Sequence, residues 1–269
     1  MKRLAKLTAC ALTVLTVLSS SARPANGVAG DTYCPHGGNV TSSSCIDSRF
    51  GETYTGAYGS WNNNTMWLDS PGAQSGPHYD IGYHINWEMW LYTQATSDVS
   101  LLVEFGLRDG KANWIPCGCR DYVIFWAEFD SQGAEHPHWL ASTGPTGQNH
   151  HYQISLDTTT FNKWMLLLDG NNQGSTSYQT SSLAYEIATG LEVTRPPVGQ
   201  LVGTWAHADT FDSQALASRD PSGNWTAWTY NTDWIDQPCS PHNGLPAYPA
   251  GSCFNGTAPV PSDWQANKP

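Results

Sequence analysis

Several glutamates interrupt apolar, strand-like segments at positions where two carboxyl groups could act together as acid and base. Glu104 lies within LLVEFGLRDG, and Glu186 and Glu192 lie within AYEIATGLEVT. A polar group buried without a partner costs roughly 2–7 kcal/mol, so each glutamate must occupy either a solvated face or a reaction centre. When two carboxyls converge on one cleft, repulsion and burial raise the pKa of one, which then serves as acid beside an ionised base. Such a pair can hydrolyse peptide or glycosidic bonds.

Alternation along the strand-like segments predicts which side chains share a face. In residues 101–108 one parity is wholly apolar and is predicted to form the core between two sheets, which leaves Glu104 on the opposite face. In residues 121–130 the set Val123, Phe125, Ala127 and Phe129 is given the same core role. Extended to residues 85–93 and 184–194, the pattern predicts a single face that carries Trp90, Tyr92, Glu104, Trp126, Glu128, Glu186 and Glu192.

Aromatic side chains beside carboxylates on a sheet favour the binding of an extended polymer, either a polypeptide or a polysaccharide. The reason is that exposed aromatic clusters usually mark binding surfaces. The competing interpretation is a set of ordinary solvated strand faces with isolated glutamates. Within the catalytic interpretation, Glu186 and Glu192 compete for the role of partner to Glu104.

The elements that must position these residues are strands. Strand-like segments follow one another from about residue 83 to residue 232, separated by polar turns such as RDGKAN, DSQG and DGNNQG. These turns carry the residues that turn geometry favours, and no long segment has helical periodicity. Eight or nine strands without intervening helices predict an all-β fold, namely an antiparallel two-sheet sandwich or jelly roll.

The first residues have the features of a secretory signal peptide. MKRLAK is basic, LTACALTVLTVL is apolar, and SSSA offers small residues for cleavage after Ala22, with cleavage as late as about residue 29 as an alternative. The apolar segment is too short for a stable membrane span. The remainder is predicted to comprise an irregular lead-in (23–80), a β-sandwich domain (81–234) and a Pro/Gly-rich, disulfide-tethered tail (235–269). The predicted location is therefore extracellular.

The charge of the chain argues against two classes of partner. Removal of residues 1–22 takes three of the 12 Lys and Arg and none of the 23 Asp and Glu, so the mature chain carries 9 − 23 = −14 with neutral histidines. A strongly acidic protein is repelled by nucleic acid phosphates and by anionic membranes. Neither is predicted as a partner, and a monomer that acts on an extended polymer is expected.

Six cysteines remain after signal removal, and an even number in a secreted chain predicts disulfides. The spacing suggests local bridges between Cys34 and Cys45 and between Cys239 and Cys253. Cys117 and Cys119, in CGC, are then either a strained pair or two separate tethers. All six residues are disulfide candidates, and the full connectivity stays open.

Metal chemistry finds little support in the sequence. The motifs HPH (His136, His138) and HH (His150, His151) lack the helical spacing of HExxH, and paired CxxC motifs are missing from the sequence. No metal or cofactor is predicted. Calcium bound by an Asp/Asn turn such as DGNNQG stays open for this type of fold.

The order of the segments resembles that of the glutamic peptidases. LLVEFGL is followed by YVIFWAEFD, HHYQISLD, WMLLLDGNNQGSTSYQT and ATGLEV, over roughly residues 85–230. The resemblance implies a concanavalin A-like sandwich and secreted, acid-active peptidase activity. It implies catalytic roles for Glu104, at the place of a Gln or Glu that precedes a Gly, and for Glu192. Leu107 departs from the pattern, because the neprosin-like branch favours Trp there.

Polysaccharide-active jelly rolls are the alternative. EFDSQ (128–132) approaches the Glu-x-Asp-x-Glu signature of a β-glucanase family, but Gln132 replaces the final Glu, which is normally the acid/base. The leading hypothesis is thus an acid-active peptide hydrolase with Glu104 and Glu192 as the dyad. Trp90, Tyr92, Trp126, Glu128 and Glu186 are expected to contact substrate. A carbohydrate-binding or carbohydrate-cleaving protein comes second, and a non-catalytic secreted interaction domain third.

Overall fold

The computed structural model describes most of the chain beyond its first 40 residues. The described residues are 41–47, 53–68, 84–95, 100–110, 122–142, 146–194, 206–229, 232–235, 237–242, 244–260 and 262–269. Every regular element within these ranges is a strand, which confirms the predicted all-β class. None of the described residues forms a helix long and apolar enough to cross a membrane.

Seven strands form one antiparallel sheet in the order β14-β1-β11-β4-β5-β6-β7. Their bounds are β1 (Thr41–Asp47), β4 (His84–Ala95), β5 (Ser100–Asp109), β6 (Val123–Phe129), β7 (Glu135–Ser142), β11 (Glu186–Thr194) and β14 (Thr232–Ile235). In this sheet β4 lies between β5, the next strand along the chain, and β11, which is far from it in the sequence.

The second sheet has nine strands. Its main order is β10-β9-β8-β2-β12-β16-β15, and β13 and β3 also pair with β12. Their bounds are β2 (Gly56–Asn62), β3 (Met66–Leu68), β8 (Asn149–Leu156), β9 (Trp164–Leu168), β10 (Asn171–Ser175), β12 (Ala206–Arg219), β13 (Trp225–Ala227), β15 (Asn255–Thr257) and β16 (Trp264–Lys268).

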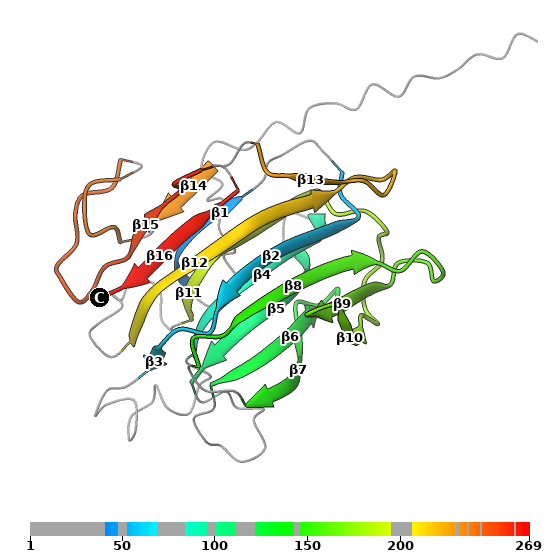
Figure 1. The fold of residues 1–269 in the computed structure, drawn as a ribbon, viewed down its shortest axis with the longest axis horizontal. Coiled ribbons are helices and arrows are strands. Elements are labelled where there is room, and N and C mark those ends of the chain that lie inside the picture. The colour runs from blue at the N-terminus through cyan, green and yellow to red at the C-terminus, as the bar shows by residue number, and fades with distance from the viewer. Residues whose placement is uncertain are drawn as a thin grey trace, which may run out of the picture.

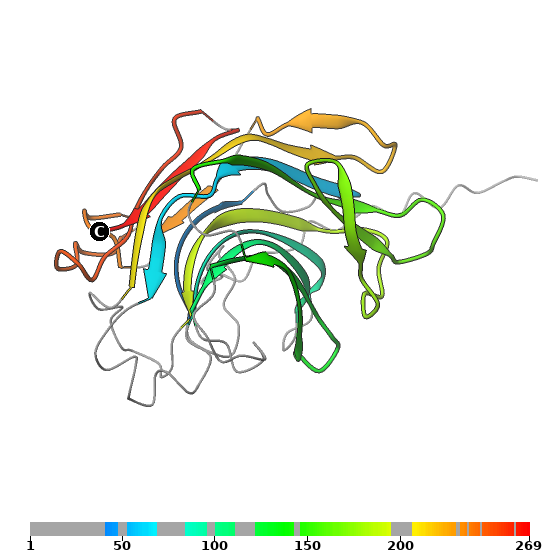
Figure 2. The same ribbon diagram turned by 60° about the horizontal axis from the view of Figure 1, so that its bottom comes forward.

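The two sheets lie face to face as a β-sandwich (Figure 1). Figure 2 shows that both sheets bend in the same sense, with the seven-stranded sheet on the inside of the curve. One face of the seven-stranded sheet therefore packs against the other sheet. Its opposite face, called the concave face below, turns away from that sheet.

Large aromatic side chains from both sheets fill the core between them. Trp61 and Tyr152 stack with ring centroids 4.0 Å apart, and Phe105 of the facing sheet meets Tyr152 edge-on at 5.1 Å. Trp87 and Phe211 form a second stacked pair across the sheets at 5.0 Å. Each such side chain contributes roughly 1.5–3 kcal/mol on burial. This packing fixes β4 and β5, and thereby the side chains on their concave face.

The predicted faces are correct for three strands of the seven-stranded sheet. Val103, Phe105 and Leu107 lie in the inter-sheet core, as the alternation predicted. Trp87, Met89 and Leu91 of β4 lie there as well, and so do Ile187, Leu191 and Val193 of β11. Glu104 consequently lies on the concave face.

The predicted face of β6 is wrong. Ile124 and Trp126 point into the inter-sheet core, whereas Val123, Phe125 and Ala127 form a separate apolar cluster on the concave face. Both parities of this strand carry large apolar residues, so alternation alone could not assign its faces. The concave cluster is stabilised from outside the strand, because the Arg108 guanidinium lies 4.0 Å from the Phe125 ring centroid.

The segment 176–185, predicted as part of a strand, is a loop in the structure. The backbone N–H groups of Ser177 and Tyr178 do not enter a ladder, because both are donated to the Glu128 carboxylate. Within this part of the predicted run of strand-like segments, the strand begins only at Glu186, the first residue of β11. Conversely, the predicted turn DGNNQG contains most of strand β10, which ends at Ser175.

The sandwich uses strands from outside the predicted 81–234 range. β1, β2 and β3 come from the expected lead-in, and β2 is an interior strand between β8 and β12. β15 and β16 come from the expected tail. The predicted Cys239–Cys253 disulfide is confirmed. Cys34, Cys117, Cys119, the side chain of Cys45 and the predicted signal segment lie outside the part of the chain that the structure describes.

Candidate active site on the concave face

Three adjacent strands bring a row of glutamates to the concave face. Glu192 of β11 pairs in register with Asn86 of β4, and Glu104 of β5 pairs with Trp90 of β4. Glu88 of β4 lies between those two positions, so its carboxyl stands at the midpoint. Glu88 is fully buried, and Glu104 and Glu192 are each 5 % exposed. These three residues are called the carboxyl row below.

The register also sets the spacing of the row. Glu88 is two residues and one strand away from each of the other two glutamates, a diagonal distance of roughly 7–8 Å between Cα atoms in antiparallel sheets. Glu104 and Glu192 are two strands apart, with four residues of offset along β4. The predicted dyad members therefore do not face each other directly, because the Glu88 side chain lies between them.

Two glycines make room for Glu88. Gly106 of β5 and Gly190 of β11 are its in-register neighbours on either side. A Cβ atom on Gly106 would overlap the Trp87 carbonyl oxygen and lie 2.6 Å from Glu88 Cα. At Gly106, β5 can thus approach Glu88 closely only because the position carries no side chain.

A chain of polar contacts orients the Glu88 carboxyl. Arg108 Nη1 lies 2.9 Å from Glu135 Oε1, and Arg108 Nε donates to Asn86 Oδ1 at 2.8 Å. The Asn86 Nδ2 group then donates to Glu88 Oε1 at 2.8 Å. Arg108 Nη2 also lies 3.6 Å from Glu104 Oε2. One guanidinium group therefore links Glu104 to Glu88 through Asn86.

The second oxygen of Glu88 has no hydrogen-bond partner among the described residues. Burial raises the pKa of Glu88 well above its ordinary value, and the nearby charge of Glu192 raises it further. Burial likewise raises the pKa of Glu104, with Glu88 as the largest charge contribution. Arg108 and Asn86 act in the opposite sense but do not cancel these effects. The row therefore favours protonated carboxyls where isolated glutamates would be ionised.

An apolar patch adjoins the carboxyl row on the concave face. Trp90, Tyr92, Leu102 and Ala188 form its buried part, and Phe129 and Tyr185 pack against them partly buried. Glu186 pairs in register with Tyr92, so it lies at the far side of this patch from Glu88. Such a surface can hold apolar groups of a polymer next to the carboxyls.

The structure brings five of the seven predicted site residues to one face: Trp90, Tyr92, Glu104, Glu186 and Glu192. Trp126 does not join them, because its indole lies in the inter-sheet core, where it stacks on His138 with ring centroids 3.7 Å apart. Glu128 pairs in register with Val103, whose side chain is in the core, so it lies opposite the concave face as well.

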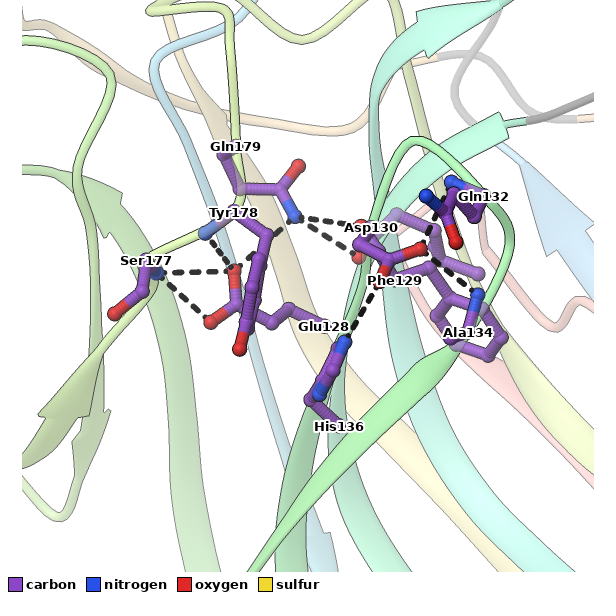
Figure 3. A network of polar contacts seen from close by, with 10 residues as sticks. Glu128, Phe129, Asp130, Gln132, Ala134, His136, Ser177, Tyr178 and Gln179 are labelled. Atoms are coloured by element: carbon purple, nitrogen blue, oxygen red, sulfur yellow. Dashed lines mark hydrogen bonds and ion pairs between the residues drawn. The ribbon is translucent and has the colours of Figure 1, made fainter.

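Glu128 anchors a loop in the structure. Its carboxylate accepts the backbone N–H groups of Ser177 and Tyr178 at 2.8 Å each, and Gln179 Nε2 lies 3.4 Å from Oε2 (Figure 3). The Tyr178 ring stacks on His136, with centroids 4.1 Å apart. The carboxylate thus has the partners that a buried structural anion requires.

The histidines of the HPH motif are separated by their contacts. His136 Nε2 lies 3.0 Å from Asp130 Oδ2, as Figure 3 shows, whereas His138 stacks on Trp126. In the HH motif, His150 Nδ1 lies 2.7 Å from Asp169 Oδ2, at the DGNNQG turn. Over the described ranges, no three His, Cys, Asp or Glu side chains are grouped as a metal site requires.

Sequence reasoning left four residues out of the site: Asn86, Glu88, Arg108 and Glu135. Alternation already placed Glu88 on the same face as Trp90 and Tyr92, and that was the available signal. Arg108 likewise shared parity with Glu104. Glu135 could not be recognised, because β7 contains Pro137 and lacks an alternating pattern.

Comparisons with known proteins show likeness in structure only. No family model matches the chain, and no curated protein matches its sequence. Scytalido-glutamic peptidase, solved with a transition-state analogue inhibitor, has a TM-score of 0.46 and 8 % identity over 85 % of this chain and 98 % of that one. SCP-B, an eqolisin peptidase solved with the tripeptide Ala-Ile-His, has a TM-score of 0.43 and 8 % identity over the same shares. A Bacillus licheniformis β-glucanase has a TM-score of 0.35 and 11 % identity over 60 % of this chain and 68 % of that one. At such identities the likeness concerns the fold alone.

Proposed function

We propose that this protein is an acid-active hydrolase that cleaves peptide bonds in extended polypeptides with carboxyl groups of the concave face. The observation that carries the proposal is the carboxyl row itself. Three glutamates from three adjacent strands share one face, and all are at least nine-tenths buried. Burial and mutual repulsion favour protonation of Glu88 and Glu104. A site that needs one protonated and one ionised carboxyl reaches that state in acid.

In this proposal Glu104 is the acid and Glu192 is the base, and because Glu88 lies between them the scissile peptide must lie over Glu88 and span the row. The Glu192 carboxylate takes a proton from water while the water oxygen attacks the scissile carbonyl carbon. The protonated Glu104 donates a hydrogen bond to the carbonyl oxygen, where negative charge develops. The proton that Glu192 took from water then passes to the leaving nitrogen as the C–N bond breaks, so both glutamates end in their starting states. The products are a carboxylic acid and an amine, and Arg108 Nη2, 3.6 Å from Glu104 Oε2, is placed to stabilise negative charge that builds up on Glu104 as it donates.

The surroundings of the row support a polypeptide substrate. The patch of Trp90, Tyr92 and Leu102 is apolar and buried rather than an exposed aromatic platform. Stacking on a sugar ring needs accessible aromatic faces, and Trp90 is fully buried while Tyr92 is 6 % exposed. The predicted second platform, Trp126, lies in the core. The partly buried Phe129 and Tyr185, at the edge of the patch, are left to contact apolar side chains of an unfolded polypeptide.

Digestion of an unfolded protein between pH 2 and pH 7, followed by mass spectrometry, tests the proposal. Wild-type protein is compared with Glu104→Gln and Glu192→Gln, which keep side-chain shape but remove the ionisable group. Loss of a catalytic acid or base typically costs about 10²–10⁴-fold in rate, so new peptides should vanish with both variants. Asp209→Asn is the matched control, because Asp209 lies on β12 of the other sheet, in an exposed position.

Two results would count against this function. If wild-type protein that has the expected β-sheet circular dichroism releases no peptides at any pH, the peptidase proposal fails. If cleavage survives either glutamine substitution at an unchanged rate, that residue is removed from the mechanism. A glycan digestion panel run on the same samples then tests the polysaccharide alternative.

A further inference from the structure

Glu88 is the most deeply buried member of the carboxyl row, and the dyad chemistry above leaves it without a role. It is fully buried at the midpoint between Glu104 and Glu192. A buried carboxylate with a purely structural role has hydrogen-bond donors on both oxygens, as Glu128 does, with Ser177 on Oε1 and Tyr178 on Oε2. Glu88 has one donor, Asn86, on Oε1, while its Oε2 atom lacks a hydrogen-bond partner in the described part of the chain.

The neighbouring contacts determine which oxygen of Glu88 can hold a proton. Arg108 Nε can only donate, so the Asn86 atom it contacts at 2.8 Å must be the amide oxygen. The Asn86 nitrogen therefore points to Glu88 and donates to Oε1. Oε1 is thus held as an acceptor, which leaves Oε2 as the oxygen that can carry hydrogen. Arg108 is itself fixed by Glu135 and by the face of Phe125.

The charges around Glu88 cannot all be ionised together at low cost. Glu192 approaches from β11, Glu104 and Arg108 from β5, and Glu135 from β7. Together with Glu88 these are four carboxyls and one guanidinium in a buried region. Close carboxyls in such a region share protons, and their titrations become coupled.

We propose that Glu88 is a positioning residue of the carboxyl row, which carries a proton on Oε2 and whose titration is coupled to those of Glu104 and Glu192. This inference rests on the proposed function, because it assigns Glu88 the regulation of that same site by pH. While Glu88 is protonated, it limits repulsion within the row. When Glu88 ionises, its charge keeps Glu104 protonated to a higher pH than the dyad alone would allow. Asn86 and Arg108 hold the geometry in which this exchange occurs.

Glu88→Gln separates this role from a structural one. Glutamine keeps the Oε1 acceptor for Asn86 and places an N–H donor where the Oε2 proton would be, so the fold is retained while the titration is removed. The alkaline limb of kcat/KM should move to lower pH by about one unit, since a neighbouring carboxylate shifts a pKa by about that amount or more. Asp209→Asn should leave the limb where it is.

Proton linkage to unfolding gives a readout that does not need activity. Because the folded-state pKa of Glu88 and Glu104 is raised, the folded protein holds protons at pH 6 that the unfolded chain releases. Wild-type protein is unfolded at pH 6 in a calorimeter, in buffers of different ionisation enthalpy. We expect the release of at least one proton per molecule. Glu88→Gln should release about one proton fewer than wild type, and Asp209→Asn should match wild type.

The outcomes distinguish this inference from the proposed function. If wild-type protein releases protons on unfolding but cleaves no peptide, the inference that the carboxyl row holds protons stands and the peptidase proposal fails. Equal proton release by wild type and Glu88→Gln would overturn the role of Glu88, whatever the cleavage result. If the variant does not fold, the wild-type measurement still decides: release of no proton at pH 6 contradicts the inference.

Discussion

Glu128 and Glu88 are both buried glutamates of the same sheet, yet their surroundings differ in kind. Glu128 is 1 % exposed and accepts backbone N–H groups from a loop (Figure 3). Glu88 is fully buried, with other carboxyls nearby and, among the residues that the structure describes, a donor on one oxygen only. A carboxylate paired with fixed donors stabilises local structure, whereas one crowded by like charges stores a proton. Burial alone therefore does not identify a reactive glutamate.

The largest expected effect concerns the space in which Glu88 is held. Gly106→Ala would place a Cβ atom against the backbone of β4, 2.6 Å from Glu88 Cα. Overpacking of this kind costs roughly 1–3 kcal/mol and at times more, and backbone atoms cannot move aside as side chains can. We expect a loss near the top of that range in the free energy of unfolding, measured with urea.

Gly133→Ala is the comparison for that change. Gly133 has open space around its Cβ position but a φ of +77°, so only the left-handed conformation opposes a side chain. The expected loss is about 1 kcal/mol. Equal losses for the two variants would show that Gly106 is not needed for the close approach to Glu88.

The second-largest expected effect concerns Glu128, whose carboxylate has hydrogen-bond donors on both oxygens. Glu128→Gln replaces one acceptor oxygen by an NH₂ group that would face the N–H donors of Ser177 and Tyr178. Leaving buried partners unsatisfied costs about 1–3 kcal/mol, so the free energy of unfolding at pH 7 should fall by that amount. Glu104→Gln at the same pH should cause no loss, because the raised pKa of Glu104 means that its charged form is disfavoured by folding. Similar losses in the free energy of unfolding for Glu128→Gln and Glu104→Gln would contradict the distinction between the anchored Glu128 carboxylate and the carboxyl row.

The smallest effect concerns a buried cation. Lys268 is fully buried, its Nζ donates to the Gly251 carbonyl at 2.8 Å, and burial lowers its pKa to about 8. Because the unfolded chain binds this proton more tightly, wild-type stability should rise between about pH 8 and pH 10.5. Lys268→Met removes that slope, so the free energy of unfolding of the variant relative to wild type should be about 1 kcal/mol higher at pH 7 than at pH 9. Thermal unfolding at the two pH values checks this, and parallel curves would contradict it.

The sequence was sufficient for the parts of the fold in which one parity of a strand is polar. In β5, Glu104 and Arg108 alternate with Val103 and Phe105, so the concave face could be assigned. In β6 both parities are apolar, and the true core face contains Trp126. On the other parity, Phe125 is covered by the Arg108 guanidinium, and alternation cannot reveal a tertiary contact of this kind.

The site was predictable only in part, for a related reason. Glu104 and Glu192 could be placed on one face, but their separation depends on register across β4, which sequence parity does not give. The register of β11 and β5 on β4 places Glu88 between Glu104 and Glu192. Asn86 lies two residues before Glu88 on the same face of β4 and donates a hydrogen bond to it. The loop at 176–185 was mistaken for a strand because its N–H groups are satisfied by a distant side chain, Glu128.

The central claim is that the carboxyl row shares protons, and a ¹³C NMR titration of the glutamate side chains from pH 3 to pH 9 tests it most directly. Signals are assigned with the single glutamine variants, and Asp209→Asn serves as control. We predict that Glu88 and Glu104 titrate well above the ordinary value of about 4.3, each signal responding to both steps. In Glu88→Gln the Glu104 midpoint should move to lower pH. Independent titration of both residues near the ordinary value would contradict the account.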